Sequence, residues 1–512
     1  MFSVKVTSEL ETRLDPEFYS PTALETVRRI KARGAWMRLG AAMQEGYRVV
    51  YHGVDTIDGL AKSQTAAFLA PTDVDSNGGF ELSQSLRVPQ SYITDYPKGV
   101  AQPGELLIEV KGNVQKLALV PSVIDEAFLV SGSFFKALLL QRIDSGYVFS
   151  FLLGKYGRIL KERLCSNSII DYIARADLES IPFPDLDARA QHFLGDKVRQ
   201  AERLRERART LEADVASVNS QYTVQPTGID FAKRIRRLAS RSLTERLDAH
   251  FYPSAVEQYF RHFTLATQSL NRLCLLVANG QSQPESAEGV RQVTVTNLRR
   301  SFVDGLMRTV QRPTDGSPTL APHDLLLCNA AHEKSYIGRD VTYSQVDGPY
   351  PSTEVMVVRV DRTQIPASFV RHHLKTQIGY LQIQSTIRGI TAHSYPSDMK
   401  LIEIPIPQVP EAERPAWFAT DDMMLQAGRC FDFANILTSA AKLLVEALIE
   451  GKVTEAELVT AQESLDRGDN SADRALLQRL KRDGVDAPGQ PPLFPDLDAL
   501  YALLAQTTPG GA

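Results

Sequence analysis

Three residues near position 100 have the types and the order of a metal-dependent nuclease site. Asp95 is followed by Glu109 and Lys111 in the segment ITDYPKGVAQPGELLIEVKG. An aspartate followed by Glu-x-Lys on a strand can hold Mg²⁺ and orient a water molecule for attack on a phosphodiester. The sequence therefore allows a nuclease, provided that these three side chains meet in the fold.

A matching strand later in the chain favours a simpler interpretation. The segment APHDLLLCN resembles QPGELLIEV, but it ends in Leu-Cys-Asn where the earlier strand has Ile-Glu-Val. A recurring scaffold strand that carries EVK by chance is therefore the favoured interpretation, and the nuclease is the alternative. The sequence also lacks GxGxxG, Asn-Pro-Pro-aromatic and GxxxxGK[ST] motifs, and its nine histidines show no metal-ligand spacing. We expect no catalytic residue and no metal site.

An internal repeat in the sequence predicts how the elements around any such site are arranged. TRLDPEFYSP begins at residue 12 and ERLDAHFYPS at residue 245, so a frame of RLD, two variable residues and FY recurs 233 residues later. A matched frame at half-length spacing predicts a duplicated domain.

Further landmarks recur in the same order, with offsets that drift as loop insertions would make them. The matched positions are Arg38, Leu39 and Gly46 with Arg272, Leu273 and Gly280; Thr72, Asp73 and Val74 with Thr296, Asn297 and Leu298; Glu105, Leu106 and Leu107 with Asp324, Leu325 and Leu326; and Ile181, Pro182 and Pro184 with Ile404, Pro405 and Pro407.

Composition places the chain among ordinary globular proteins. Of the 512 residues, 43% are hydrophobic and 23% are charged. The chain is long enough for several domains. No apolar run reaches the length of a membrane span, and four scattered cysteines without a CxxC pair fit a reducing cytoplasm. A net charge of −4 excludes a globally basic DNA-binding protein but not a local basic face.

Strand-like runs separated by turn residues fill both copies, and long helical stripes follow them. We expect an α+β fold with two tandem mixed α/β domains, a helix near 21–32, and two long helices that bury their apolar faces on each other. The expected divisions are 1–186, a first long helix at 187–220, 221–409, a second long helix within 410–450 that begins near Asp421, and an acidic helical tail at 451–512.

The tail carries eleven Asp/Glu and six Lys/Arg between Glu450 and Ala512. Thr454 should cap one helix, and Ser471 a second that stops at Gly484. LFPDLDALYALL forms a short amphipathic helix after a Pro-rich break, and we expect it to dock on a partner because it has little core of its own.

Together these features resemble the DNA specificity (S) subunit of type I restriction–modification systems, or the equivalent subunit of a related methylation-based antiphage defence system. The resemblance covers residues 1 to about 450. It rests on the paired RLDxxFY frames, the entry at Trp36–Gly40, the PGELL and PHDLL strands, and the IPxP exits into long helices. The acidic tail is an addition to that pattern.

The resemblance implies a non-catalytic subunit in which each copy is a target recognition domain that reads half of a split DNA site. The long helices would form an antiparallel coiled coil that sets the spacing and docks two methyltransferase subunits. S-adenosylmethionine would bind those partners and not this chain. A restriction or other effector subunit could join the complex. A scaffold that makes only protein contacts is the remaining alternative.

Charged and polar residues after the matched strands are the candidate DNA contacts, because such side chains reach base edges and phosphates from loops. Solvated hairpin tips and ordinary turns are the alternative interpretation. The candidates are Lys111, Asn113, Gln115 and Lys116, with Ser166, Asn167 and Ser168, in the first copy, and Arg299, Arg300, His332, Glu333, Lys334, Ser335, Tyr336, Arg388, Thr391 and His393 in the second.

Two other motifs are interpreted as structural. In each RLDxxFY frame, Arg and Asp two residues apart can pair across a turn while Phe and Tyr fill the entrance of the core. The basic run KRIRR at 233–237 is a solvated helix face, with phosphate contact as the minority alternative.

Overall fold

The computed structural model describes residues 13, 15–51, 57, 60–82, 85–124, 126–165, 171–233, 246–262, 266–298, 301–313 and 316–507. The chain forms two compact units. Unit 1 contains residues 1–204 and 433–512, and unit 2 contains 205–432. No helix in the described ranges is long and apolar enough to cross a membrane. The fold is mixed α and β, as the sequence predicts.

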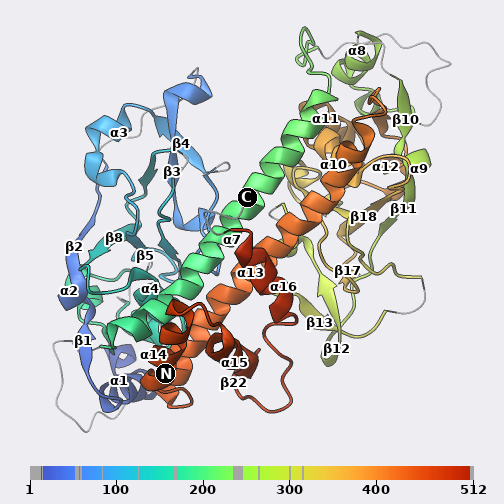
Figure 1. The fold of residues 1–512 in the computed structure, drawn as a ribbon. Coiled ribbons are helices and arrows are strands. Elements are labelled where there is room, and N and C mark those ends of the chain that lie inside the picture. Colours follow the sequence, from blue (N-terminus) through green and yellow to red (C-terminus); the bar gives the residue numbers. More distant parts are fainter. Residues whose placement is uncertain are drawn as a thin grey trace. The chain divides into compact units, whose positions relative to one another are not determined.

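Unit 1 is built around two small sheets (Figure 1). The larger is antiparallel and has the order β2 (Met43–Arg48), β8 (Phe134–Leu139), β5 (Leu106–Glu109), β6 (Leu117–Leu119). The smaller has β3 (Thr65–Leu69) between β4 (Leu86–Pro89) and β7 (Phe128–Val130), and β3 runs parallel to β7. Leu69, Leu107, Val130 and Phe134 from both sheets meet in one buried cluster, which explains the unbroken apolar run of the ELLIEV strand.

Unit 2 repeats this plan strand for strand. Its larger sheet has the order β11 (Cys274–Asn279), β18 (Val355–Val360), β14 (Leu325–Cys328), β16 (Val341–Tyr343). Its smaller sheet has β12 (Glu285–Val293) between β13 (Arg308–Val310) and β17 (Tyr350–Pro351), again with one parallel pair. Val293, Leu326 and Val357 form the matching core. The internal duplication is confirmed.

The entrance and exit of each copy pair with each other. In unit 1, β1 (Trp36–Arg38) pairs antiparallel with β9 (Pro182–Pro184), and in unit 2, β10 (Thr267–Ser269) pairs with β20 (Glu403–Pro405). The short helices beside them are α2 (Leu39–Ala42), α6 (Arg175–Glu179), α9 (Leu270–Leu273) and α12 (Pro396–Met399).

Backbone pairing corrects two of the sequence matches. The N–H of Leu39 donates to the carbonyl of Ile181, and the N–H of Leu270 donates to that of Ile402. Leu39 therefore corresponds to Leu270 and not to Leu273, and Ile181 corresponds to Ile402 and not to Ile404. Residues of similar type stand a few positions away from the structurally equivalent ones. Only the backbone hydrogen bonds define the correct register.

A tightly crossed helix pair follows the last strand of the larger and smaller sheets in each copy. The pairs are α4 (Ser145–Leu153) with α5 (Lys155–Arg163), and α10 (Ala367–Lys375) with α11 (Gln377–Ser385). A Cβ on Gly157 would lie 2.3 Å from the Phe151 carbonyl oxygen, and one on Gly379 would lie 2.2 Å from that of His373. Both crossings therefore require glycine.

The RLDxxFY frame of unit 1 is a structural tie, as predicted. The Arg13 guanidinium donates twice to Asp15, at 2.8 and 2.9 Å, and also to the carbonyls of Leu164 and Cys165 just after α5. The Tyr19 hydroxyl donates back to the Arg13 carbonyl at 2.7 Å. Hydrogen bonding to Arg13 lowers the pKa of Asp15, so the pair stays ionised near neutrality.

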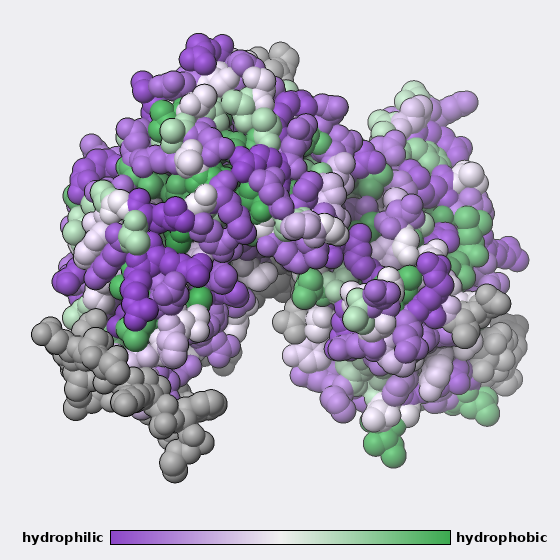
Figure 2. Space-filling model, turned by 90° about the horizontal axis from the view of Figure 1, so that it is seen from below, coloured by the Kyte–Doolittle hydropathy of each residue, from purple (hydrophilic) through white to green (hydrophobic). Residues whose placement is uncertain are grey.

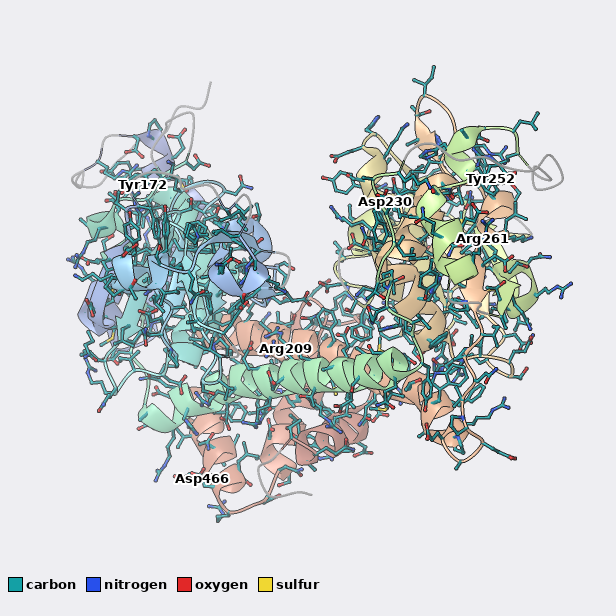
Figure 3. All side chains as sticks on the ribbon, turned by 90° about the horizontal axis from the view of Figure 1, so that it is seen from above. Tyr172, Arg209, Asp230, Tyr252, Arg261 and Asp466 are labelled. Atoms are coloured by element: carbon teal, nitrogen blue, oxygen red, sulfur yellow. The ribbon has the colours of Figure 1, made fainter. Side chains whose placement is uncertain are left out.

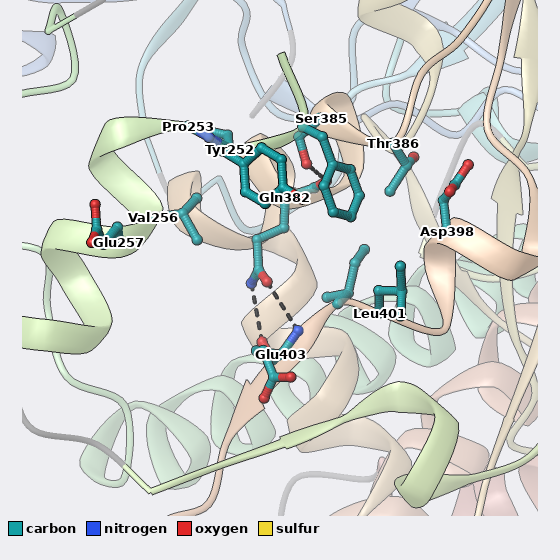
Figure 4. A pocket seen from close by; sticks show the side chains of 12 residues that line it. Tyr252, Pro253, Val256, Glu257, Gln382, Ser385, Thr386, Asp398, Leu401 and Glu403 are labelled. Atoms are coloured by element: carbon teal, nitrogen blue, oxygen red, sulfur yellow. Dashed lines mark hydrogen bonds between the residues drawn. The ribbon is translucent and has the colours of Figure 1, made fainter. Parts of the chain in front are cut away.

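The frame of unit 2 repeats these contacts in a looser setting. Arg246 donates twice to Asp248 and once to the Thr386 carbonyl after α11, and the Tyr252 hydroxyl donates to the Arg246 carbonyl. Phe18 and Tyr19 are buried, whereas Phe251 and Tyr252 are half-buried beside a cavity of about 250 Å³ (Figure 4). The same tie therefore closes the first copy more fully than the second.

Each frame leads into a helix of its copy. The helix expected near 21–32 is α1 (Pro21–Ala32), and its counterpart is α8 (Ser254–His262). The Ser20 hydroxyl accepts from the Ala23 N–H, and Pro21 occupies the first helical position, where no backbone donor is needed.

Two long helices, α7 (Ala188–Gln221) and α13 (Arg414–Glu450), pack together, as predicted. The chain passes from unit 1 to unit 2 within α7 and returns within α13. In unit 2 the Tyr222 ring, just after α7, lies 6.0 Å from the Trp417 ring near the start of α13, so the helices run antiparallel. Because the compact units divide both helices, the boundaries expected near 186 and 409 stay predictions.

The start expected for the second long helix, Asp421, is wrong. The helix begins seven residues earlier, because Pro415 is tolerated in a first turn and Trp417 belongs to the buried face. On α7 the predicted stripe is buried from Leu194 to Val215.

The tail folds back onto unit 1 as α14 (Glu455–Asp466), α15 (Ser471–Arg479), the hairpin β21 (Leu480–Lys481) and β22 (Gly484–Val485), and α16 (Leu497–Ala505). The Thr454 cap is confirmed, since its hydroxyl accepts from the Glu457 N–H. The Ser471 cap is wrong: Asn470 takes that position, and the helix ends at Arg479 in a hairpin and not at Gly484.

The last helix has a core to join, contrary to expectation. The Lys197 ammonium of α7 and the Tyr501 hydroxyl of α16 both donate to Asp473 Oδ2, at 2.8 and 2.7 Å. Lys197 and Asp473 are at most 1% exposed, and Leu500 and Leu503 are buried. The premise for docking on a partner is therefore wrong: the helix packs on its own chain.

The first prediction concerns the frame of unit 1. Arg13→Gln should destabilise the entrance by about 2 kcal/mol, because two carbonyls and Asp15 lose a charged donor. Hydrogen exchange of the last amides of α5 should accelerate. Arg28→Gln, an arginine 73% exposed on α1, is the matched control and should change nothing. Equal exchange in both variants would contradict the structural role.

The second prediction concerns the tail. Asp473→Asn should cost unit 1 about 3 kcal/mol, because it leaves the Lys197 ammonium buried without its carboxylate. Faster hydrogen exchange in α15 and α16 is the expected signal. Asp483→Asn removes an exposed carboxylate from the same tail and serves as control. Unchanged exchange in Asp473→Asn would show that the ion pair does not hold the tail.

Candidate nucleic-acid interface

The first candidate cluster lies in a tight turn between β5 and β6. Gly112 and Val114 adopt positive φ angles of 119° and 50°. The Glu109 carboxylate accepts from the backbone N–H groups of Gln115 and Lys116, at 3.0 and 2.9 Å. Glu109 therefore closes the turn and fixes its shape.

The candidate side chains of this turn divide into two groups. Lys116 Nζ donates to a backbone carbonyl of the loop after β3 at 2.7 Å, and Gln115 donates to Glu162 at 2.6 Å. These contacts anchor the turn to the body of the unit. Lys111 and Asn113 are exposed and are the members that a ligand can reach.

A β-bridge joins Lys111 to Tyr172, which follows the second candidate cluster of the first copy. Tyr172 is 37% exposed and lies at the end of unit 1 remote from α7 (Figure 3). The Arg48 guanidinium sits 5.4 Å from the centre of its ring. The sequence did not predict a role for Arg48, the last residue of β2, or for Tyr172. Ser166, Asn167 and Ser168 lie outside the described residues.

The second unit brings its two candidate clusters together at the same place. β15 (Ala330–Ala331) pairs antiparallel with β19 (Ala392–His393), which matches the Lys111–Tyr172 bridge. The turn His332–Tyr336 and the turn Arg388–His393 therefore leave one small sheet side by side. Their sequence separation gives no indication of this.

Hydrogen bonds hold the backbone of the turn His332–Tyr336, whereas its side chains are exposed to solvent. Two of its carbonyls accept from Tyr380 and Gln384 of α11, at 3.1 and 3.0 Å. Its five side chains, including the predicted His332, Lys334, Ser335 and Tyr336, are exposed. Arg339, not predicted from the sequence, lies 4.4 Å from the centre of the Tyr336 ring. The result is an aromatic and cationic surface on a firm support.

The turn Arg388–His393 mixes structural and exposed residues. Arg388 and His393 exchange two backbone hydrogen bonds, of 2.8 and 3.1 Å, and the Arg388 guanidinium donates to Asp398. Asp398 also lies 3.6 Å from Arg246 of the frame, so Arg388 helps to brace the unit. Thr391 is exposed and remains available for contact.

A groove of about 750 Å³ runs beside the turn His332–Tyr336. It combines an aromatic ring, one guanidinium, an imidazole, carboxylates and apolar side chains, including Val295, Thr296, Leu298, Cys328, His332, Tyr336, Arg339 and Asp340. Arg299 and Arg300 follow Leu298 directly but lie outside the described residues. Of the KRIRR run, Lys233 is exposed, and 234–237 lie outside the description as well.

The geometry assigns Glu109 to the scaffold. Its carboxylate is 4% exposed and closes the β5–β6 turn, while Asp95 ends a separate helix, α3 (Tyr92–Asp95). Burial lowers the pKa of nearby Lys161 to about 8, and the Glu109 carboxylate opposes this shift. Among the described residues, no group of three or more His, Cys, Asp or Glu could hold a metal ion.

No protein-family model and no curated protein matches the chain. Among solved structures, it is similar to the type I restriction–modification S subunit from M. genitalium, with 12% identity over 84% of this chain and 95% of that one and a TM-score of 0.35. The HsdS subunit from Thermoanaerobacter tengcongensis matches with 15% identity over 86% and 97% and a TM-score of 0.24. A chain from a study of type I R-M complex assembly and conformational transition matches with 14% identity over 86% and 97% and a TM-score of 0.27.

The third prediction tests the exposed turn of unit 1. If it contacts a DNA backbone, Lys111→Gln should weaken duplex binding by similar factors for all sequences and reduce the slope of log K against log salt by about 1. Fluorescence anisotropy across a salt series measures this. Lys62→Gln changes an exposed lysine elsewhere in unit 1 and is the control. Equal slopes for the two variants would remove Lys111 from the interface.

Proposed function

We propose that this chain is a non-catalytic DNA specificity subunit that reads a bipartite site with its two repeated domains. One observation carries the proposal: the same scaffold is built twice, and the exposed side chains at the equivalent turn differ. The first copy presents Lys111 and Asn113, whereas the second presents His332, Lys334, Ser335 and Tyr336. A conserved support with divergent tips is the arrangement expected of two domains that read different half-sites.

The chemistry of these tips suits DNA. Lysine and arginine bind phosphates, and asparagine, serine and histidine donate to or accept from base edges in the major groove. Figure 2 shows one face of the molecule, on which hydrophilic side chains predominate and hydrophobic patches are scattered. Interfaces with DNA are more polar than those between proteins. The near-neutral chain would depend on local positive charge at the turns and not on its net charge.

The proposal assigns the spacing of the half-sites to α7 and α13. A helix is stiff, and the 34 residues of α7 correspond to about 51 Å of axial length. A duplicated chain can also imitate a two-fold dimer, and so could hold two copies of one methyltransferase subunit. S-adenosylmethionine and the methyl-transfer chemistry would then belong to those partners, with a restriction or effector subunit as a possible addition to the assembly.

The fourth prediction is a split methylation motif. The full chain should be co-expressed with a methyltransferase subunit from the same organism, and methylated bases mapped across the host genome. We expect two short specific blocks separated by a fixed nonspecific spacer. Replacing residues 1–186 with the equivalent domain of another specificity subunit should change one block only. A continuous motif, or methylation that does not depend on this chain, would overturn the proposal.

The control for the replacement of residues 1–186 is the single substitution Glu109→Gln in the same domain. Because the Glu109 carboxylate closes a turn, this change should loosen the Lys111–Lys116 segment and weaken one block without creating a new one. Loss of Mg²⁺-dependent DNA cleavage by the isolated chain in this variant would instead support the nuclease alternative.

A further inference from the structure

Unit 1 contains a polar hollow that its proposed reading surface, Lys111 and Asn113, does not use. Its volume is about 520 Å³, and it opens where the α4–α5 junction meets the C-terminal half of α13 and the loop beside the tail hairpin. Five cationic side chains line it, against one carboxylate, Glu446; the cations are Lys116, Lys155, Arg158, Lys442 and Arg482.

Glu446, the carboxylate that lines the hollow, already accepts a hydrogen bond from the protein. Glu446 Oε1 accepts from the Lys155 backbone N–H at 2.7 Å, at the first residue of α5. Burial raises the pKa of Glu446, and its hydrogen bond to the Lys155 N–H and the charge of Lys155 oppose this shift. Lys155 also lies 3.8 Å from Glu450, so one of the five cations is partly compensated outside the hollow. Among the lining side chains, cations therefore outnumber carboxylates by five to one.

The cations are supplied by four separate parts of the unit. Lys116 ends the β5–β6 turn and is held by the Val74 carbonyl, and Lys442 of α13 donates to Asn77 at 3.3 Å. Arg158 of α5 and Arg482 of the tail hairpin are exposed. Like charges that line one hollow repel each other, and a bound anion would relieve that repulsion.

Neutral donors complete the lining. Ser76, Asn77, Gln115 and Ser439 bring hydroxyl and amide groups into the hollow. Several cations that converge from different directions, together with neutral donors, match an anion with several charged oxygens better than a single carboxylate. The volume accommodates a diphosphate or a short stretch of nucleic-acid backbone.

We propose that this hollow binds a phosphate-bearing anion, supplied either by a free polyphosphate or by the backbone of DNA bound to unit 1. The proposal also gives the acidic tail a role. The tail folds onto unit 1 through the Lys197–Asp473 pair, and its hairpin thereby brings Arg482 to the hollow. An acidic segment thus contributes one of the cations.

The fifth prediction uses the full chain with Arg158→Gln combined with Arg482→Gln. Both arginines are exposed, so the variant should fold. Arg467→Gln, another exposed tail arginine that does not line the hollow, is the matched control. Two measurements are made on each protein: calorimetric titration with pyrophosphate, and anisotropy of a labelled DNA duplex over a salt series.

The two sources give different results. If the anion is free, pyrophosphate should bind the parent and the control, and the double variant should bind it at least about tenfold more weakly. If the anion is DNA backbone, pyrophosphate should not bind, and the double variant should lose about 1 to 2 from the salt slope of duplex binding while the control keeps the parent slope. If the double variant matches the control in both measurements, the proposal is wrong.

The pyrophosphate measurement does not depend on sequence-specific DNA reading. Failure of the split-motif experiment would therefore leave this site standing, and failure here would leave the specificity-subunit proposal standing.

Discussion

Each copy of the repeated domain depends on one arginine. Arg13 and Arg246 are held by an aspartate two residues later, and each reaches the carbonyls that end the second helix of the crossed pair. Those carbonyls cannot be satisfied within the helix, so a charged donor from the domain entrance stabilises them. The same guanidinium approaches an aspartate near the exit, at 3.3 Å for Asp177 and 3.6 Å for Asp398. One side chain therefore joins entrance, helix pair and exit.

Because this arginine holds each domain together, the side chains of the exposed turns can differ between the two copies while the fold stays the same. The larger sheet, the smaller sheet and the helix pair hold the ends of the β5–β6 turn and of its counterpart after β14. Glu109 in one copy, and Tyr380 and Gln384 in the other, support the backbone by different means. The exposed side chains make few demands on the core, so their identities are open to change without loss of stability.

The tail gives unit 1 additional elements that have no counterpart among the described residues of unit 2. The buried Lys197–Asp473 pair is costly to form unless both charges are satisfied, and the Tyr501 hydroxyl supplies the additional hydrogen bond. Such a pair specifies where the tail lies more than it adds to stability. The tail thereby places the hairpin that carries Arg482 beside α13.

The sequence by itself determined the duplication, the α+β class, the helix Pro21–Ala32, the long helix of 188–221 and the structural meaning of RLDxxFY. These follow from local chemistry: periodicity, capping residues and side chains that pair within a few positions. It did not determine the register of Leu39 with Leu270, the crossings at Gly157 and Gly379, or the docking of α16. Nor did it show that the two candidate clusters of the second copy meet across a small sheet, or that Arg482 lies beside four cations from other parts of the sequence. Those contacts join residues many positions apart, and their energy depends on burial and distance, which only the tertiary structure decides.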